Sequence, residues 1–97
     1  MITVEDIVAF SGLNRDEVLA IAEHEHMPEV AACALAEYLM QQEHGPERIR
    51  EMIVKDVRDA QERGDKEHVR VLLHVLHHFV REHPESLPMA GHLKDVT

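Results

Sequence analysis

The chain has 97 residues, nine of them histidines, a single cysteine, and a formal net charge of -9 when the histidines are neutral. This length predicts one domain with one modest core. The negative charge disfavours a nucleic-acid or anionic-membrane partner, because both attract basic surfaces. Cys33 is alone, and the chain contains neither a signal-peptide pattern nor an apolar run of about 18 residues. We therefore expect a cytoplasmic protein with no nucleic-acid or membrane partner.

Cap and stop signals divide the chain into five predicted helices. The first, capped by Thr3, runs to about Phe10; the second, capped by Asn14, stops near His26; the third starts with Pro28 in its first turn and runs to about Glu43; the fourth follows Gly45 and Pro46 to Arg63; the fifth, capped by Asp65, ends before Pro84. No strand-like alternation occurs. The fold class is thus all-α, with four main helices in a compact bundle plus a short N-terminal helix.

The third predicted helix is apolar over most of its circumference, so we expect it to be the central one. The two-residue connection between Arg63 and Asp65 predicts an antiparallel hairpin of the last two helices. Residues 1–83 are expected to form the single helical domain, and residues 84–97, which contain Pro84, Pro88 and Gly91, an extended or flexible tail.

The fifth predicted helix carries histidines opposite its apolar side. A rotation of about 100° per residue predicts a core stripe on one face: Val69, Leu72, Leu73, Leu76, Phe79 and Val80. His74 and His78 then point away from this stripe, together with Val71 and Val75. Such a face is a solvated surface, a subunit interface formed by Val71, His74, Val75 and His78, or part of a metal site, since histidines four residues apart can reach one ion.

The second concentration of histidines lies at the end of the second predicted helix, in the segment from Glu23 to Glu29. Helical rotation directs Glu25 and His26 toward the packed side, and Glu23 and His24 outward. These polar groups either satisfy the helix terminus or ligate a metal. Glu23 and His26 match one half of the motif of di-iron carboxylate bundles, but no second copy of the motif exists.

The stretch from Asp16 to Glu29, DEVLAIAEHEHMPE, resembles a group of small bacterial cytosolic proteins that have no assigned activity. The resemblance implies a small cytosolic helical protein. It implies no catalytic or ligand-binding residue.

These patterns support a non-enzymatic interaction or accessory protein that binds a protein partner or self-associates as a homo-oligomer. The alternative is a module that binds a divalent metal such as zinc, iron or nickel through Glu23, His26, His74 and His78. A third hypothesis is a helix-turn-helix DNA-binding protein built on the first two helices. The acidic second helix opposes it, because Asp16, Glu17, Glu23 and Glu25 would repel phosphates.

Overall fold

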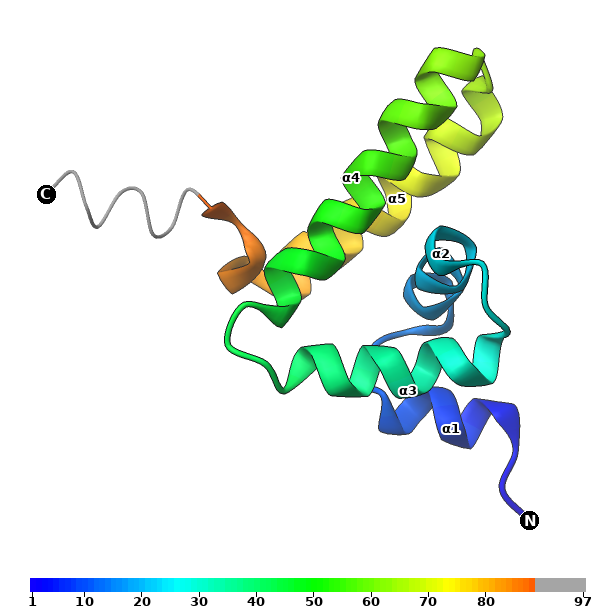
Figure 1. Cartoon of the computed structure of the whole chain (residues 1–97), viewed down its shortest axis with the longest axis vertical. Helices are drawn as coiled ribbons and strands as arrows, with labels where there is room; N and C mark the ends of the chain where they lie inside the picture. The colour runs from blue at the N-terminus through cyan, green and yellow to red at the C-terminus, as the bar shows by residue number, and fades with distance from the viewer. Residues whose placement is uncertain (89–97) are drawn as a thin grey trace, which may run out of the picture.

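Five α-helices and one short 3₁₀ helix make up the protein in a computed structural model, which describes residues 1–88 (Figure 1). The elements are α1 (Val4–Phe10), α2 (Arg15–Glu25), α3 (Glu29–Met40), α4 (Gly45–Arg63), α5 (Lys66–Glu82) and η1 (Pro84–Ser86). No strand occurs within the described range. The predicted all-α fold class, with a short N-terminal helix before four longer ones, is confirmed.

The three N-caps predicted from the sequence are all formed. The side chains of Thr3, Asn14 and Asp65 each accept a hydrogen bond from the backbone N–H three residues further on. Each bond satisfies an amide that the helix leaves without a partner, which is typically worth about 1 kcal/mol. Gly64 ends α4 in the left-handed region at φ 74°, so α5 turns back along α4 as an antiparallel neighbour (Figure 1).

The boundaries of α3 differ from the prediction at both ends. Pro28 is the N-cap of the helix rather than a residue of its first turn, and the helix ends at Met40 instead of near Glu43. Gly45, the first residue of α4, lies very close to the end of α3. A Cβ atom at Gly45 would overlap the backbone carbonyl of Leu39, so α4 can begin here only with glycine.

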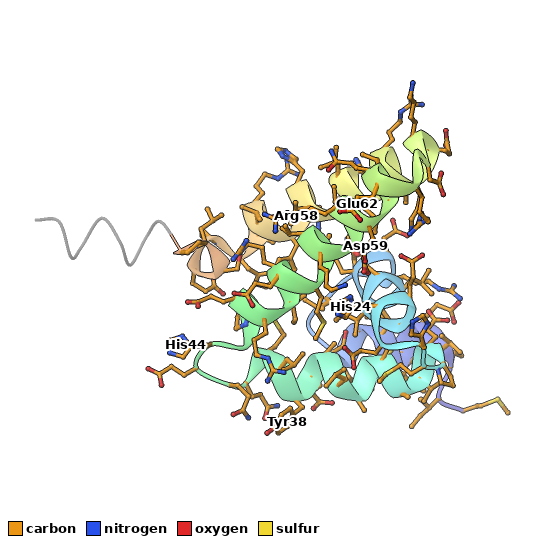
Figure 2. The ribbon with its side chains drawn as sticks, turned by 45° about the horizontal axis from the view of Figure 1, so that its top comes forward. His24, Tyr38, His44, Arg58, Asp59 and Glu62 are labelled. Carbon is orange, nitrogen blue, oxygen red and sulfur yellow. The ribbon has the colours of Figure 1, made fainter. Side chains whose placement is uncertain are left out.

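The central helix is α2, and the prediction that α3 is central was wrong. α2 packs against each of the other four α-helices, whereas α3 packs against α1, α2 and α4. α3 keeps Val30 and Tyr38 exposed, and Tyr38 lies on its outer side (Figure 2). The small side chains that made α3 look uniformly apolar are split between a buried face, with Ala32 and Ala36, and an exposed one.

All five α-helices contribute to one hydrophobic core. Its largest fully buried apolar side chains are Phe79, Ile21, Leu39, Ile49 and Ile53. Burial of one such side chain stabilises the fold by roughly 1.5–3 kcal/mol. Within residues 1–88, no helix has the length and apolarity needed to cross a membrane.

The segment after Pro84 is not entirely an extended tail. Residues Pro84–Ser86 form η1, which packs against α4 and α5, and Ser86 is fully buried. Arg50 of α4 donates a hydrogen bond from Nε to the backbone carbonyl of Ser86 at 2.9 Å. The expectation was therefore wrong for these three residues. The rest of the predicted tail, residues 89–97, lies outside the described residues.

Candidate functional site

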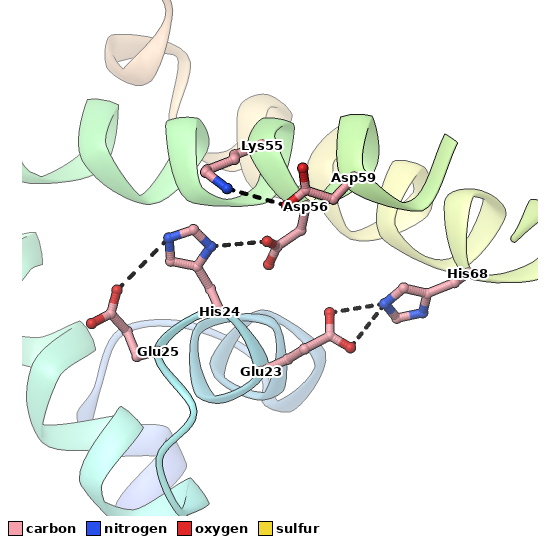
Figure 3. A network of polar contacts seen from close by, with 7 residues as sticks. All are labelled: Glu23, His24, Glu25, Lys55, Asp56, Asp59 and His68. Atoms are coloured by element: carbon pink, nitrogen blue, oxygen red, sulfur yellow. Dashed lines mark hydrogen bonds and ion pairs between the residues drawn. The ribbon is translucent and has the colours of Figure 1, made fainter. Parts of the chain in front are cut away.

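Three histidine–carboxylate pairs join α2 to the α4–α5 hairpin. His24 Nδ1 lies 2.9 Å from Asp56 Oδ1 on α4, and His68 Nε2 of α5 lies 2.8 Å from the carboxylate of Glu23 (Figure 3). The third pair joins His78 Nδ1 of α5 to Glu17 Oε2 at 2.9 Å. Each pair links residues at least 32 positions apart in the chain. Together they hold the central helix against the hairpin.

Glu17 is the most deeply buried member of these pairs, with 1% of the residue exposed. Its Oε1 accepts a hydrogen bond from the backbone N–H of Asn14 at 3.0 Å, which completes the capping box of α2. Its Oε2 is the atom that faces His78. A buried carboxylate requires such partners, because an unpaired charge in the interior is costly.

The four predicted metal ligands do not form one cluster. Glu23 is paired with His68, and His78 is paired with Glu17. His26 is exposed at the end of α2, where it adopts a left-handed conformation at φ 56°, and His74 is exposed on α5. In the part of the chain that the structure describes, no group of three or more His, Cys, Asp or Glu side chains could hold a metal ion.

Several predicted orientations were wrong. Glu25 was expected on the packed side of α2 and Leu73 in the core stripe of α5, but both are exposed. His24, labelled in Figure 2, was expected to point outward, but its side chain is 18% exposed and faces Asp56 of α4 (Figure 3). His26 was expected on the packed side, but it is exposed, because the chain leaves helical geometry at this residue. Val75 was expected on the outer face of α5 but is buried, because α5 packs against α2 as well as α4.

An apolar groove of about 460 Å³ lies between α2 and α5. Leu19 and Ala20 of α2 and Val71, Leu72 and Val75 of α5 form its apolar lining. Its polar lining residues are Asp16 and Glu23 from α2 and His68, Arg70 and His74 from α5. Three of the four residues predicted for an interface, Val71, His74 and Val75, therefore line one groove. The fourth, His78, does not line the groove; its side chain is paired with that of Glu17.

The two helices that form this groove run in opposite senses, and α2 crosses α5 at a steep angle (Figures 1 and 3). Glu17 near the start of α2 meets His78 toward the end of α5, and Glu23 near the end of α2 meets His68 near the start of α5. The acidic lining residues consequently lie along one wall of the groove, and the arginine and the histidines lie along the other. This segregation of charge comes from the helices themselves, because each wall is a single helix.

A second, polar cleft adjoins the groove and shares Glu23 and His68 with it. It is lined by charged and histidine side chains: Glu23, His24, His26, Lys55, Asp56, Asp59, Arg63 and His68. Several of them pair with one another, including Lys55 with Asp59 at 3.2 Å (Figure 3). No serine, threonine or cysteine lines this cleft.

Leu19 and Ala20, which supply the apolar part of the α2 side of the groove, were not predicted as site residues. Leu19 did carry a signal, because it is a large apolar residue next to Val18 and Ile21, which are buried. The contact of Asp56 with His24 and the contact of Glu17 with His78 carried no sequence signal, because the two residues of each pair lie 32 and 61 positions apart in the chain.

Comparison with protein-family models, with curated proteins and with solved structures gives no match. The resemblance of the segment from Asp16 to Glu29 to small bacterial cytosolic proteins stays a prediction. The function is therefore inferred from the geometry of the molecule.

Proposed function

We propose that this protein is a non-enzymatic interaction module and that the groove between α2 and α5 is its docking surface. One observation carries the proposal: Leu19 and Val71, two large apolar side chains that are 42% and 48% exposed, stand on the two walls of one apolar groove. Isolated exposed apolar residues are normal on a protein surface, but an apolar groove with a polar rim is typical of a recognition site.

The histidine–carboxylate pairs give this groove a preformed shape. The Glu17–His78 and Glu23–His68 pairs connect its two walls directly, and the His24–Asp56 pair anchors α2 to α4. A preformed surface loses little conformational entropy when a partner binds, which favours affinity. In this proposal the histidines are structural supports of the docking surface rather than ligands or catalysts.

Site-specific photocrosslinking of the full chain in cells tests this proposal. A benzoylphenylalanine side chain at position 71 would stand at the groove, and the same side chain at position 30 is the matched control, because Val30 is 53% exposed on α3. We expect light-dependent protein adducts from position 71, lost when Leu19→Glu is added, and none from position 30. Absence of adducts at position 71, or equal adducts at both positions, would contradict docking at this groove.

Metal binding is the competing interpretation, and it has its own readout. Protein purified without a metal column would be subjected to elemental analysis. We expect no stoichiometric zinc, iron or nickel, because Glu23 and His78 already have protein partners. Stoichiometric metal that disappears in a His74→Ala, His78→Ala double variant would favour the metal interpretation and count against docking.

A further inference from the structure

We infer, on the basis of the proposed docking function, that the groove between α2 and α5 receives an amphipathic α-helix of a partner protein. This helix places its apolar face in the groove, a basic side chain toward α2 and an acidic side chain toward α5. Three features of the groove support this occupant: the spacing of the lining residues, their position within helices, and the charges at the rim.

The lining residues of each wall form a stripe along one face of a helix. Two groups of them share the spacing i, i+3, i+4, i+7: Asp16, Leu19, Ala20 and Glu23 on α2, and His68, Val71, Leu72 and Val75 on α5. A stripe of this length covers about two turns, or about 10 Å. Stripes with apolar centres are surfaces on which a further helix packs, through its own apolar residues at i, i+3 or i+4, and i+7.

The apolar part of the groove favours a helical occupant over an extended one. Its side chains belong to the interiors of two α-helices, where the backbone N–H and C=O groups are bonded within the helix. An extended peptide would therefore find no main-chain partners there, and its own N–H and C=O groups would be buried unpaired, which is costly. A helical segment satisfies these groups internally.

The charged groups at the rim differ between the two walls. Asp16 is exposed on α2, and Arg70 and His74 are exposed on α5. Arg70 Nη1 lies 3.8 Å from Glu67, and both side chains are 80% exposed, so this pair holds Arg70 weakly. A lysine or arginine of the occupant can thus bind Asp16, and an aspartate or glutamate can bind Arg70. The reversed orientation would bring like charges together, so the rim selects which side of the helix faces each wall.

The other two charged lining residues support the groove rather than select its occupant. Glu23 and His68 are bonded to each other at 2.8 Å. At longer range, the net charge of -9 attracts a partner of opposite sign. We therefore expect the outer face of the occupant helix, which does not enter the groove, to carry an excess of lysine and arginine.

Peptide display against the full chain tests the helical occupant. One phage library would randomise one face and both edges of a stable single helix, and a second would present unstructured peptides of the same length. Counter-selection on the Leu19→Glu variant removes peptides that bind outside the groove. We expect enrichment from the helical library alone, with large apolar residues at i, i+3 or i+4, and i+7, basic residues on one edge and acidic residues on the other. Enrichment of unstructured peptides, or of no peptide, would overturn the inference.

Fluorescence anisotropy of a selected helical peptide tests the charges. Leu19→Glu should weaken binding at least about tenfold, and Val30→Glu, which alters an exposed residue of α3, should leave it unchanged. Asp16→Lys and Arg70→Glu should each weaken binding about two- to fivefold, as expected for exposed ion pairs. A peptide with the opposite charge at the facing edge position should restore each loss. Circular dichroism of every variant should show unchanged helix content. Equal effects of Leu19→Glu and Val30→Glu, or no restoration by the altered peptides, would overturn the inference.

The helical occupant and the docking function can fail separately. If the crosslinker at position 71 traps a protein but the helical library yields no peptide, the helical occupant is wrong and docking at the groove stands. The same holds if the trapped protein is a second copy of this chain. If position 71 gives no adduct and neither library is enriched, both are wrong.

Discussion

Removal of the His78 side chain should destabilise the protein more than removal of any other histidine. In the His78→Ala variant the carboxylate of Glu17 keeps its bond to the backbone N–H of Asn14 but loses the imidazole that faces Oε2. Glu17 is almost fully buried, so little water reaches the orphaned oxygen in the native structure.

The expected cost follows from the burial of the carboxylate. A hydrogen bond to a charged group is worth about 1.5–3 kcal/mol, and full loss of a buried ionic partner costs about 3–5 kcal/mol. The side chain of His78 is 37% exposed, so its removal admits some water toward Glu17. We therefore expect a loss of about 2 kcal/mol in the free energy of unfolding.

The other two pairs provide an internal scale. His24→Ala exposes Asp56, whose side chain is 15% exposed and whose Oδ2 already lacks a partner, so we expect a loss of about 1.5 kcal/mol. His68→Ala releases Glu23, whose side chain is 46% exposed, and a pair of this kind contributes less than about 1 kcal/mol. The predicted order of destabilisation is thus His78, then His24, then His68.

Urea denaturation followed by circular dichroism at neutral pH measures this order. With a slope near 1 kcal/mol per molar urea, His78→Ala should lower the midpoint by about 2 M. In a Glu17→Gln background the same substitution should cost at least about 1 kcal/mol less, because no buried charge is orphaned. Equal losses for His78→Ala and His68→Ala, or no coupling to Glu17→Gln, would refute the reasoning.

Three further outcomes are expected. Gly45→Ala should lower stability by at least about 3 kcal/mol in the same assay, because its Cβ overlaps the carbonyl of Leu39, whereas Gly64→Ala, with open space around it, should cost only about 1 kcal/mol of backbone strain. Burial raises the pKa of the Cys33 thiol, so Cys33 should react slowly with iodoacetamide at about pH 8.5 in the native protein and fast in urea. Equal reaction rates in the native and the urea-unfolded protein would contradict this burial. Because the folded state holds the thiol proton more tightly, the free energy of unfolding should fall as the pH rises through the raised pKa. Ser86→Ala should leave stability unchanged or raise it slightly, because Ser86 Oγ is buried without a partner; a loss above about 1 kcal/mol would indicate a bond to that hydroxyl.

The features that could be predicted from the sequence are those set by nearest neighbours along the chain. The caps at Thr3, Asn14 and Asp65 depend on a side chain and an amide three residues apart, and the turn at Gly64 depends on one glycine. Each of these signals involves only residues that are close in sequence, so the folded protein contains each cap and the turn as predicted.

The orientation of the faces could not be predicted in the same way. Helical periodicity predicts a single buried stripe on α5, but α5 packs against both α4 and α2, which buries Val75 as well as Phe79. The last turn of α2 ends in a left-handed residue, so rotation along an ideal helix misplaced His26. These errors arise where a second neighbour or a helix end overrides the pattern of one isolated helix.

Only the α5 side of the candidate site was predicted from the sequence. Val71 and His74 stood out because they interrupt the expected pattern of α5, but a groove needs a second wall. That wall belongs to α2, about 50 residues earlier in the chain, and its position depends on contacts such as Glu17–His78 that no local pattern encodes.

Photocrosslinking from position 71 of the full chain in cells, with position 30 as the control, tests the central claim most directly, because Val71 lines the groove and Val30 lies on α3. The account predicts light-dependent protein adducts from position 71 that are lost when Leu19→Glu is added. Absence of adducts at position 71, or equal adducts at positions 71 and 30, would contradict it.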